Sequence, residues 1–223
     1  ANIISLNSIL TGSLEASTDD YDWFKFTLPS NGKIMFVASP TSYLDVVLDI
    51  YDTNGTSIIN DTWVSGGAGV IDTLYHKHLL AGTYYLRIRI NYSQSGSYSL
   101  QNIFTPASLT NDTESNDTYN TAITLSLNST TTGHIGFYGN QYTDNYDWYK
   151  FTLTNDGYIM FVINPSSTLD AVLDIYDTNG TSIINDTWAS GGEGATDTLT
   201  HRHLLAGTYY LRIRYNYSQY GSY

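Results

Sequence analysis

The stretch LDIYDTNGTSIINDTW occurs twice in the chain, at residues 48–63 and again, letter for letter, at residues 173–188. In the first copy, apolar and polar residues alternate over residues 48–51, which is the pattern of a half-buried strand. The Asn-Gly pair at residues 54–55 tolerates positive φ and favours a tight hairpin turn. Residues 57–60 then supply the returning strand. The stretch therefore predicts one β-hairpin in each of two units.

The repeat extends well beyond the hairpin. Residues 44–98 align with residues 169–223 over 55 positions, and nine of these positions differ. Such close duplication is more typical of a repeated building block or binding face than of a duplicated active site. We expect a first repeat over residues 1–104, a polar linker over 105–121, and a second repeat over 122–223.

Several short apolar segments separated by turn residues fill each repeat. In the first repeat, strands are predicted at residues 22–28, 33–38, 44–51, 84–90 and 97–103. Residues 33–38 (KIMFVA) are almost continuously apolar, which favours a central strand. No segment sustains a 3.6-residue period, so little or no helix is expected. The predicted fold class is all-β, with two tandem antiparallel β-sandwiches of the jelly-roll or immunoglobulin-like kind.

Composition narrows the function. The net charge is −12 with nine Lys plus Arg, which argues against nucleic acid and against an anionic membrane surface as partners. No apolar run is long enough to insert into a membrane. Cysteine is absent and charged residues are only 13% of the chain, whereas the 21 tyrosines accompany many Thr, Ser and Asn residues. We expect an extracellular or cell-surface protein, and no signal peptide is recognisable at Ala1.

An ordered set of motifs carries a family resemblance. They are ESND at residues 114–117, DNYDWYKFTL at 144–153, LDAVLDIYDTNG at 169–180 and LLAGTYYLRI at 204–213. In this order they resemble the pre-peptidase C-terminal domain family. The resemblance covers nearly all of the second repeat and, without ESND, nearly all of the first. It implies non-catalytic β-sandwich modules that accompany secreted enzymes or occur in surface proteins, some of which bind matrix polymers.

The resemblance also implies a calcium site, because some members hold Ca²⁺ between the linker and the entry of a strand. Ca²⁺ takes six to eight oxygen ligands, which clustered carboxylates and an amide can supply. A solvated acidic linker is the structural alternative. The matching positions are Glu114, Asn116, Asp117, Asp144 and Asp147, with Asp112 as an extra ligand. The first repeat keeps Asp19 and Asp22 without an acidic segment before them, so its site is expected to be half-built.

Nine Asn-x-Ser/Thr sequons predict N-linked glycans if the source is archaeal or eukaryotic. Chance in a chain rich in Asn, Ser and Thr is the alternative. Asn116 cannot be both a metal ligand and a glycan site. The remaining eight candidates are Asn54, Asn60, Asn91, Asn111, Asn128, Asn179, Asn185 and Asn216.

Two further patterns receive structural interpretations. Asp45 and Asp49 share a strand face and are interpreted as a solvated face rather than an acid/base pair. Trp63 and Trp188 follow the hairpins, and burial in the core or at a sheet edge is favoured for them over stacking on sugars. No nucleophile elbow or metalloprotease helix is present, so an enzyme is not expected.

The second repeat stops before the counterpart of residues 99–102, which are expected to close the first sandwich. An unclosed sandwich exposes a sheet edge that invites pairing. Further repeats, or a strand from another copy such as its residues 2–10, would close it. The hypothesis is a non-catalytic extracellular structural protein, a glycosylated subunit of a filament, fibre or stalk whose partners are copies of itself in a linear polymer. The alternative is an accessory module of a secreted hydrolase or peptidase that binds carbohydrate or matrix.

Overall fold

The computed structural model describes residues 1–62, 66–107, 112–139, 142–187, 191–217 and 220–223. It divides into two compact units. Unit 1 comprises Ala1–Ala107 with Tyr138–Tyr142, and unit 2 comprises Ser108–Phe137 with Thr143–Tyr223. The segment expected to be a free linker is thus shared between the units. Its acidic part belongs to unit 2, and the later segment Tyr138–Tyr142 belongs to unit 1.

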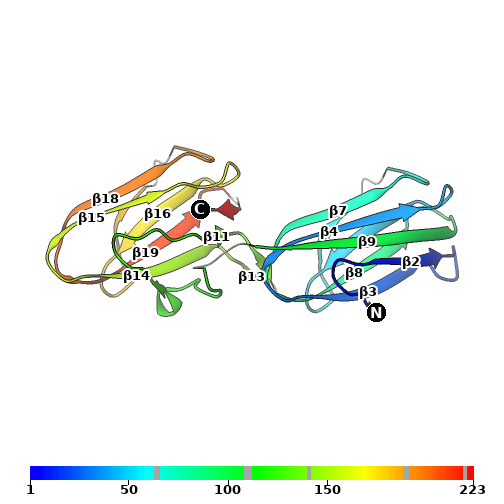
Figure 1. The fold of residues 1–223 in the computed structure, drawn as a ribbon, viewed down its shortest axis with the longest axis horizontal. Helices are drawn as coiled ribbons and strands as arrows, with labels where there is room; N and C mark the ends of the chain where they lie inside the picture. Colours follow the sequence, from blue (N-terminus) through cyan, green and yellow to red (C-terminus); the bar gives the residue numbers. More distant parts are fainter. Residues whose placement is uncertain (63–65, 108–111, 140–141, 188–190, 218–219) are drawn as a thin grey trace. The chain divides into compact units, whose positions relative to one another are not determined.

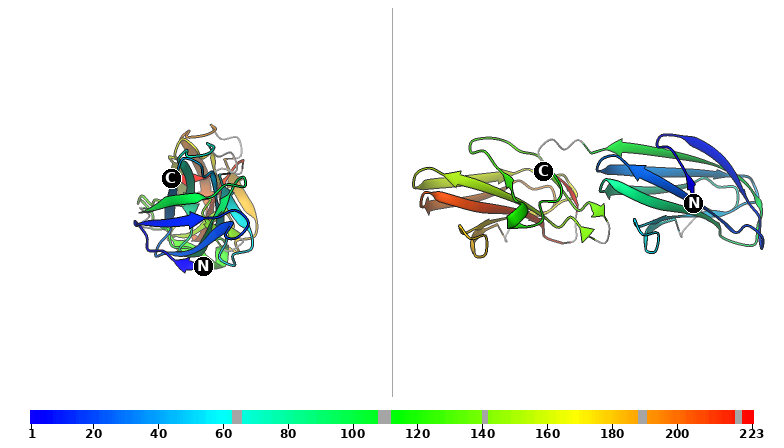
Figure 2. Two further views of the ribbon diagram at one scale, coloured as in Figure 1. Left: turned by 90° about the vertical axis from the view of Figure 1, so that its right-hand side faces the viewer. Right: turned by 90° about the horizontal axis from the view of Figure 1, so that it is seen from below.

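Unit 1 is a sandwich of two sheets. One sheet has the order β1-β3-β8-β5-β6 and the other has the order β13-β12-β7-β4-β9-β2. Its long strands run side by side (Figures 1 and 2). The strands are β1 (Asn2–Ile3), β2 (Ile9–Leu14), β3 (Tyr21–Leu28), β4 (Gly32–Pro40), β5 (Val46–Tyr51), β6 (Ile58–Asp61), β7 (Asp72–Leu79), β8 (Gly82–Ile90), β9 (Gly96–Pro106), β12 (Tyr138–Gly139) and β13 (Tyr142–Thr143).

The predicted hairpin is confirmed as the β5–β6 pair. Gly55 takes a φ of 70°, a left-handed conformation that costs glycine little. The Asp52 carboxylate accepts backbone N–H bonds from Thr56 at 2.9 Å and from Ser57 at 3.3 Å. The side chain of Asp52 therefore holds the turn that the Asn-Gly pair makes possible.

The core of unit 1 lies between its two sheets. Phe26 of β3 and Phe36 of β4 meet edge to face across it, with ring centroids 5.1 Å apart, and Tyr84 of β8 stacks on Phe26. β4 lies between β7 and β9 in the second sheet, as its continuous apolar sequence predicts. β9 contributes Leu100 and Phe104 to the same core, so the closing strand supplies packing as well as hydrogen bonds.

Unit 2 repeats the first sheet and only part of the second. Its five-stranded sheet has the order β10-β14-β19-β16-β17, and β15 pairs with β18 while β11 pairs with β20. The described elements are η1 (Tyr119–Thr121), β10 (Ile123–Thr124), β11 (His134–Ile135), β14 (Tyr146–Leu153), β15 (Gly157–Ile163), β16 (Ala171–Tyr176), β17 (Ile183–Asp186), β18 (Asp197–Leu204), β19 (Gly207–Tyr215) and β20 (Gly221–Ser222). The all-β prediction is confirmed, since η1 is the one helical turn among the described residues.

The N-terminal strand, considered above as a donor to another copy, lies in unit 1. Asn2 and Ile3 pair in parallel with Phe24 and Lys25 of β3. Ile4 follows them and is 6% exposed within the core. In this structure the N-terminal residues are therefore used by their own unit.

The interpretation of Asp45 and Asp49 as a solvated face is wrong. Both are buried, Asp49 completely. The Oδ2 atom of Asp49 accepts hydrogen bonds from the guanidinium group of Arg87 at 2.9 Å and from the Nε atom of Arg89 at 3.1 Å. Alternation misleads here because both faces of β5 are covered, and a carboxylate can be buried when guanidinium groups reach it.

Removing the charge of Asp49 should therefore destabilise unit 1. In Asp49→Asn, two arginines face each other over a neutral amide, and breaking a buried pair in this way costs about 3 kcal/mol. Urea unfolding followed by circular dichroism measures the loss. Glu15→Gln, at an exposed position, is the matched control. Equal midpoints for the two variants would contradict this account of the pair.

Candidate metal centre

The acidic part of the expected linker folds back onto the entry of β14 in unit 2. The carbonyl of Asn116 accepts the Trp148 N–H at 3.0 Å, which pins the segment beside the strand. Asp144 lies just before β14, and Asp147 lies within it. A pair of backbone bonds joins the Asp144 region to Gly136 and Phe137 at 2.8 Å each. The acidic segment and the entry of β14, which are 25 or more positions apart in sequence, are thereby brought together.

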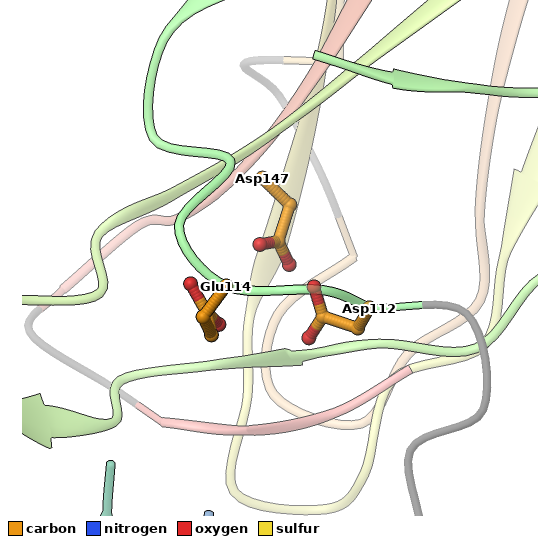
Figure 3. A group of neighbouring side chains, drawn as sticks. All are labelled: Asp112, Glu114 and Asp147. Carbon is orange, nitrogen blue, oxygen red and sulfur yellow. The ribbon is translucent and has the colours of Figure 1, made fainter. Parts of the chain in front are cut away.

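The carboxylates form two overlapping groups. One ligand oxygen each from Asp112, Glu114 and Asp147 lie within 4.8 Å of one another, and the same holds for Glu114, Asp117 and Asp144. Figure 3 shows the Asp112 and Glu114 side chains on the linker facing Asp147 on the strand. Glu114 belongs to both groups, so the cluster is continuous around it. The structure thus brings together all six residues, counting Asn116, that the resemblance implied.

Several oxygens in this cluster are buried without a hydrogen-bond donor. They are Glu114 Oε1, Asn116 Oδ1, Asp144 Oδ1 and Asp147 Oδ1. Asn116 and Asp147 are completely buried, and Asp144 is 3% exposed. A buried oxygen without a partner loses its hydration without compensation. Four such atoms in one cluster are the arrangement that a cation would satisfy.

The other oxygens of the cluster are held in place by neutral donors. The Tyr223 hydroxyl donates to Asp147 Oδ2 at 2.5 Å, and Tyr149 shares a 2.8 Å bond with the same hydroxyl. Asp112 accepts the Asn116 amide at 3.0 Å and the His134 N–H at 2.9 Å. These contacts orient Asp112 and Asp147, and they leave Asp147 Oδ1 without a donor.

Burial and mutual repulsion raise the pKa values of these acids. Desolvation, followed by the charges of Asp147 and Glu114, raises the pKa of Asp144 to about 10. Desolvation also raises the pKa of Glu114 to about 8 and that of Asp112 to about 6. The pKa of Asp147 is raised for the same reasons, burial first. At neutral pH the cluster therefore needs either protons or a cation.

The donor set fits a hard divalent cation. It consists of carboxylate oxygens and one amide oxygen, and within the described part of the chain neither carboxylate group includes a histidine or a cysteine. Oxygen ligands in this number suit Ca²⁺, whose coordination is large and flexible, better than Zn²⁺. A bound cation would replace the missing hydrogen bonds and lower the repulsion among the acids.

The corresponding place in unit 1 is open. Asp22 is half-buried and accepts the Tyr98 hydroxyl at 2.5 Å, just as Asp147 accepts Tyr223. Asp19 is exposed, and its backbone pairs with Glu15 in a tight loop. The structure does not gather further carboxylates around Asp19 and Asp22 among the described residues of unit 1.

Each unit also carries an aromatic platform, which is centred on Trp148 in unit 2 and on its counterpart Trp23 in unit 1. A further ring covers the platform of unit 2. In unit 2, the Tyr119 ring lies edge to face on Trp148 at 6.1 Å and on Tyr210 at 5.9 Å. Gly180 lies directly beneath that ring, where a Cβ would meet it at 2.7 Å. Trp148 is 7% exposed, whereas its counterpart Trp23 in unit 1 is only half-buried.

The sequons fall into three kinds of environment. Asn54, Asn128 and Asn179 are exposed. The other described amides are engaged: Asn60 and Asn185 donate to the backbone of the neighbouring strand, and Asn91 and Asn216 donate to buried aspartates. Asn116 is completely buried. Asn111, like Trp63 and Trp188, lies outside the described residues.

Tyr223 and Tyr149 are site residues that sequence reasoning missed. A signal did exist, because Tyr223 aligns with Tyr98 and both repeats end their alignment on a tyrosine. What the alignment lacked was the pairing of that tyrosine with Asp147, 76 positions away.

Comparison with known proteins gives likenesses of fold. No family model matches the chain, and no curated protein matches it. It is similar to the pre-peptidase C-terminal domain of collagenase from Bacillus anthracis, with 20% identity and a TM-score of 0.38 over 45% of this chain and 92% of that one. It is also similar to a mitogen derived from Yersinia pseudotuberculosis, with 16% identity and a TM-score of 0.35 over 48% and 90% of the two chains. A carbohydrate-binding module of Cellvibrio mixtus lichenase 5A gives 16% identity and a TM-score of 0.26 over 46% and 74%.

These identities are all below 25%, so function must be argued from the side chains of the site. The structure adds one finding on membranes: among the described residues there is no helix with the length and apolar character needed to span a bilayer.

The raised pKa values predict an unusual pH dependence once divalent cations are chelated. Because the folded pKa values of Glu114 and Asp144 lie above the usual unfolded values near 4, their contribution to stability is present at low pH. It is lost as pH rises through about 8 and about 10. The melting temperature in chelator should therefore fall between pH 5 and pH 9, and saturating Ca²⁺ should reduce that fall. A melting temperature that rises over this range in chelator would contradict the prediction.

Proposed function

We propose that this chain is a non-catalytic, calcium-binding β-sandwich module of an extracellular protein, related to the pre-peptidase C-terminal domains. The observation that carries the proposal is the set of four buried oxygens in unit 2 that lack a hydrogen-bond donor. A purely structural acidic loop would turn such oxygens toward water. Here they turn toward one another, where Ca²⁺ supplies the missing positive charge.

Calcium in this position would fasten the segment 112–117 to the sandwich. Four of the six ligand residues, Asp112, Glu114, Asn116 and Asp117, come from that segment, and Asp144 and Asp147 come from the body of unit 2. Without a cation, the carboxylates repel and the segment is held mainly by neutral hydrogen bonds. Binding would therefore stiffen the chain where one repeat gives way to the next.

The role we favour for such a module is accessory, holding a secreted hydrolase or peptidase to polysaccharide or matrix. The uncovered platform on unit 1 supports it. Trp23 and Tyr51 pack at 4.6 Å, and Arg87 lies 5.6 Å and 5.2 Å from the two ring centroids. Trp23 is half-buried and Tyr51 is 7% exposed, so it is the accessible part of the Trp23 ring, with a guanidinium beside it, that can stack on a sugar ring or hold a tyrosine of a matrix protein.

A filament subunit is the second candidate. The two repeats are nearly identical, and unit 1 carries two surfaces whose counterparts on unit 2 are covered by residues 112–119: the Asp19 and Asp22 pair, and the Trp23 platform. A copy of that acidic segment from another polypeptide would match both surfaces. Repeated use of this match would give a linear array of copies, with glycans on exposed sequons such as Asn54.

Calcium binding is tested by two equivalent aspartates. Asp147→Asn removes a ligand in unit 2, whereas Asp22→Asn changes the matched position in unit 1, and both keep a tyrosine partner. At 100 times its dissociation constant, Ca²⁺ should stabilise the unsubstituted chain by about 2.7 kcal/mol. Differential scanning calorimetry should show this gain preserved in Asp22→Asn and lost in Asp147→Asn. Equal gains in both variants, or none in the unsubstituted chain, would refute the metal site.

The accessory and filament roles predict different behaviour in Ca²⁺. An accessory module should stay monomeric and sediment with cellulose, chitin or collagen, and Trp23→Ala should reduce that binding about tenfold if stacking contributes 1–2 kcal/mol. Trp148→Ala is not an equivalent control because Trp148 is buried, so Tyr43→Ala at an exposed position serves instead. Filaments seen by electron microscopy, without binding to any polymer, would favour the second role.

A further inference from the structure

Four loops lie together at one end of unit 1 (Figure 1). They follow β2, β4, β6 and β8, and they include residues 15–20, 41–45, 66–71 and 91–95. We call the surface of these residues the loop end. Hydrogen bonds of 2.9–3.0 Å join each loop to the next, from Ala16 to Ser95, from Asp45 to Gln94 and from Gly69 to Leu44.

The two repeats differ mainly at this end. Nine positions differ between residues 44–98 and 169–223, and six of them lie in these loops or at the strand residues next to them: 46, 68, 70, 71, 90 and 95. Substitutions without a functional consequence would spread over the exposed positions of the whole repeat. Their concentration indicates that the loop end of unit 1 and its counterpart in unit 2 present different surfaces to other molecules.

The loop end contains a polar pocket of about 290 Å³. Asp20 Oδ1 accepts the Ser17 N–H at 2.8 Å, while Ser17 itself takes a φ of 74°. This conformation is uncommon for a residue other than glycine, so the hydrogen bond holds the pocket wall in a defined shape. The lining side chains that matter for binding are those of Ser17, Asp20, Ile90, Tyr92 and Ser93.

Two substitutions change the equivalent place in unit 2. Asn145 stands where unit 1 has Asp20, and Tyr215 stands where unit 1 has Ile90. The Tyr215 hydroxyl donates to Asn145 Oδ1 at 2.8 Å. Unit 2 therefore presents a neutral amide that is already engaged, whereas unit 1 presents a carboxylate beside an aliphatic side chain.

The charge of the loop end favours a cationic ligand. Its residues include the exposed acids Glu15, Asp19 and Asp20, and their sequence contains no Lys, Arg or His. Such a surface attracts positive groups. Tyr92 lines the same pocket as Asp20 and is 68% exposed. A carboxylate next to an accessible aromatic ring offers an ammonium or guanidinium group both an ion pair and a cation–π contact.

Apolar side chains project from two of the loops. Tyr43, Val70 and Ile71 are 80%, 45% and 60% exposed. In unit 2 the same positions hold threonine, alanine and threonine, and the two threonines, Thr168 and Thr196, are exposed as well. The position of these side chains is thus common to both units, and their apolar character belongs to unit 1. Gathered apolar side chains of this kind mark a contact surface for a protein partner.

We propose that the loop end of unit 1 binds a basic, partly apolar segment of another protein. A Lys or Arg side chain of that segment enters the pocket beside Asp20 and Tyr92. A neighbouring apolar residue of the segment packs on Tyr43, Val70 and Ile71. The inference depends neither on the calcium site of unit 2 nor on the Trp23 platform.

The probe is a fluorescent peptide with the sequence Gly-Leu-Lys-Leu-Gly and an amidated C-terminus, titrated with the full chain in Ca²⁺. Fluorescence anisotropy should show saturable binding that weakens as salt is raised, because the contact is partly ionic. A peptide with Gln in place of Lys should bind about tenfold more weakly, since it loses a charge-assisted hydrogen bond. Equal binding of the two peptides, or no binding of either, would overturn the proposal.

Matched variants locate the contact. Asp20→Asn keeps an oxygen for the Ser17 N–H and should weaken binding of the Lys peptide about tenfold. Glu193→Gln removes the same charge at the equivalent end of unit 2 and should leave binding unchanged. An equal loss in both variants would mean that net charge alone attracts the peptide, and would overturn the site.

A double variant converts the pocket of unit 1 into its counterpart. Asp20→Asn with Ile90→Tyr installs the residue pair of unit 2, and it should abolish binding without changing the melting temperature. Retained binding in this variant would overturn the pocket assignment.

The apolar contact and the class of ligand are tested separately. Ile71→Thr, which installs the residue of unit 2, should weaken binding of the Lys peptide about fivefold. Unchanged binding in this variant would refute the apolar part of the proposal. Cellohexaose should not compete with the peptide, and competition by this neutral sugar would refute the claim that the occupant is cationic.

Discussion

Mutual repulsion among five carboxylates is the constraint that most shapes unit 2. Asp112, Glu114 and Asp117 approach Asp144 and Asp147 closely enough to share ligand-distance contacts. Burial makes this costly, because the charges lose water and face one another at short range. This unfavourable free energy arises where the linker meets the sandwich, because the backbone there brings the five carboxylates together. The Tyr223 hydroxyl holds one oxygen of Asp147 and leaves the other without a donor, which is the preparation that a cation site requires.

Closure of the sheets is the second constraint. A sandwich hides its core only when each inner face is completed, and in unit 1 β9 completes it with both side chains and ladder bonds. Unit 2 keeps the surroundings of that strand, including the left-handed Asn128, without a described strand between them.

Equivalent side chains in the two units differ in burial, and the difference shows the effect of their surroundings. Trp23 and Trp148 occupy equivalent places and each lies near an arginine, yet one is half-buried and the other almost fully buried. The difference comes from Tyr119, a residue of the segment between the repeats. Asp22 and Asp147 differ in the same way, because residues 112–117 enclose only the second. The segment between repeats thus converts one of two similar surfaces into a closed site.

The sequence alone determined the class of fold, the duplication and the identity of the acidic residues. Period-2 patterns and turn residues such as Asn54-Gly55 are local properties, so they can be read without knowing which strands are neighbours. The tertiary structure decided three things that depend on distant contacts. It buried Asp49 against Arg87 and Arg89, against the expectation of a solvated face, because both sides of β5 are covered. It assigned the acidic part of the linker to unit 2 and added Tyr223 to its cluster. It also placed the Tyr119 ring over Trp148 in unit 2, because such packing follows from contacts between distant residues that no local pattern encodes.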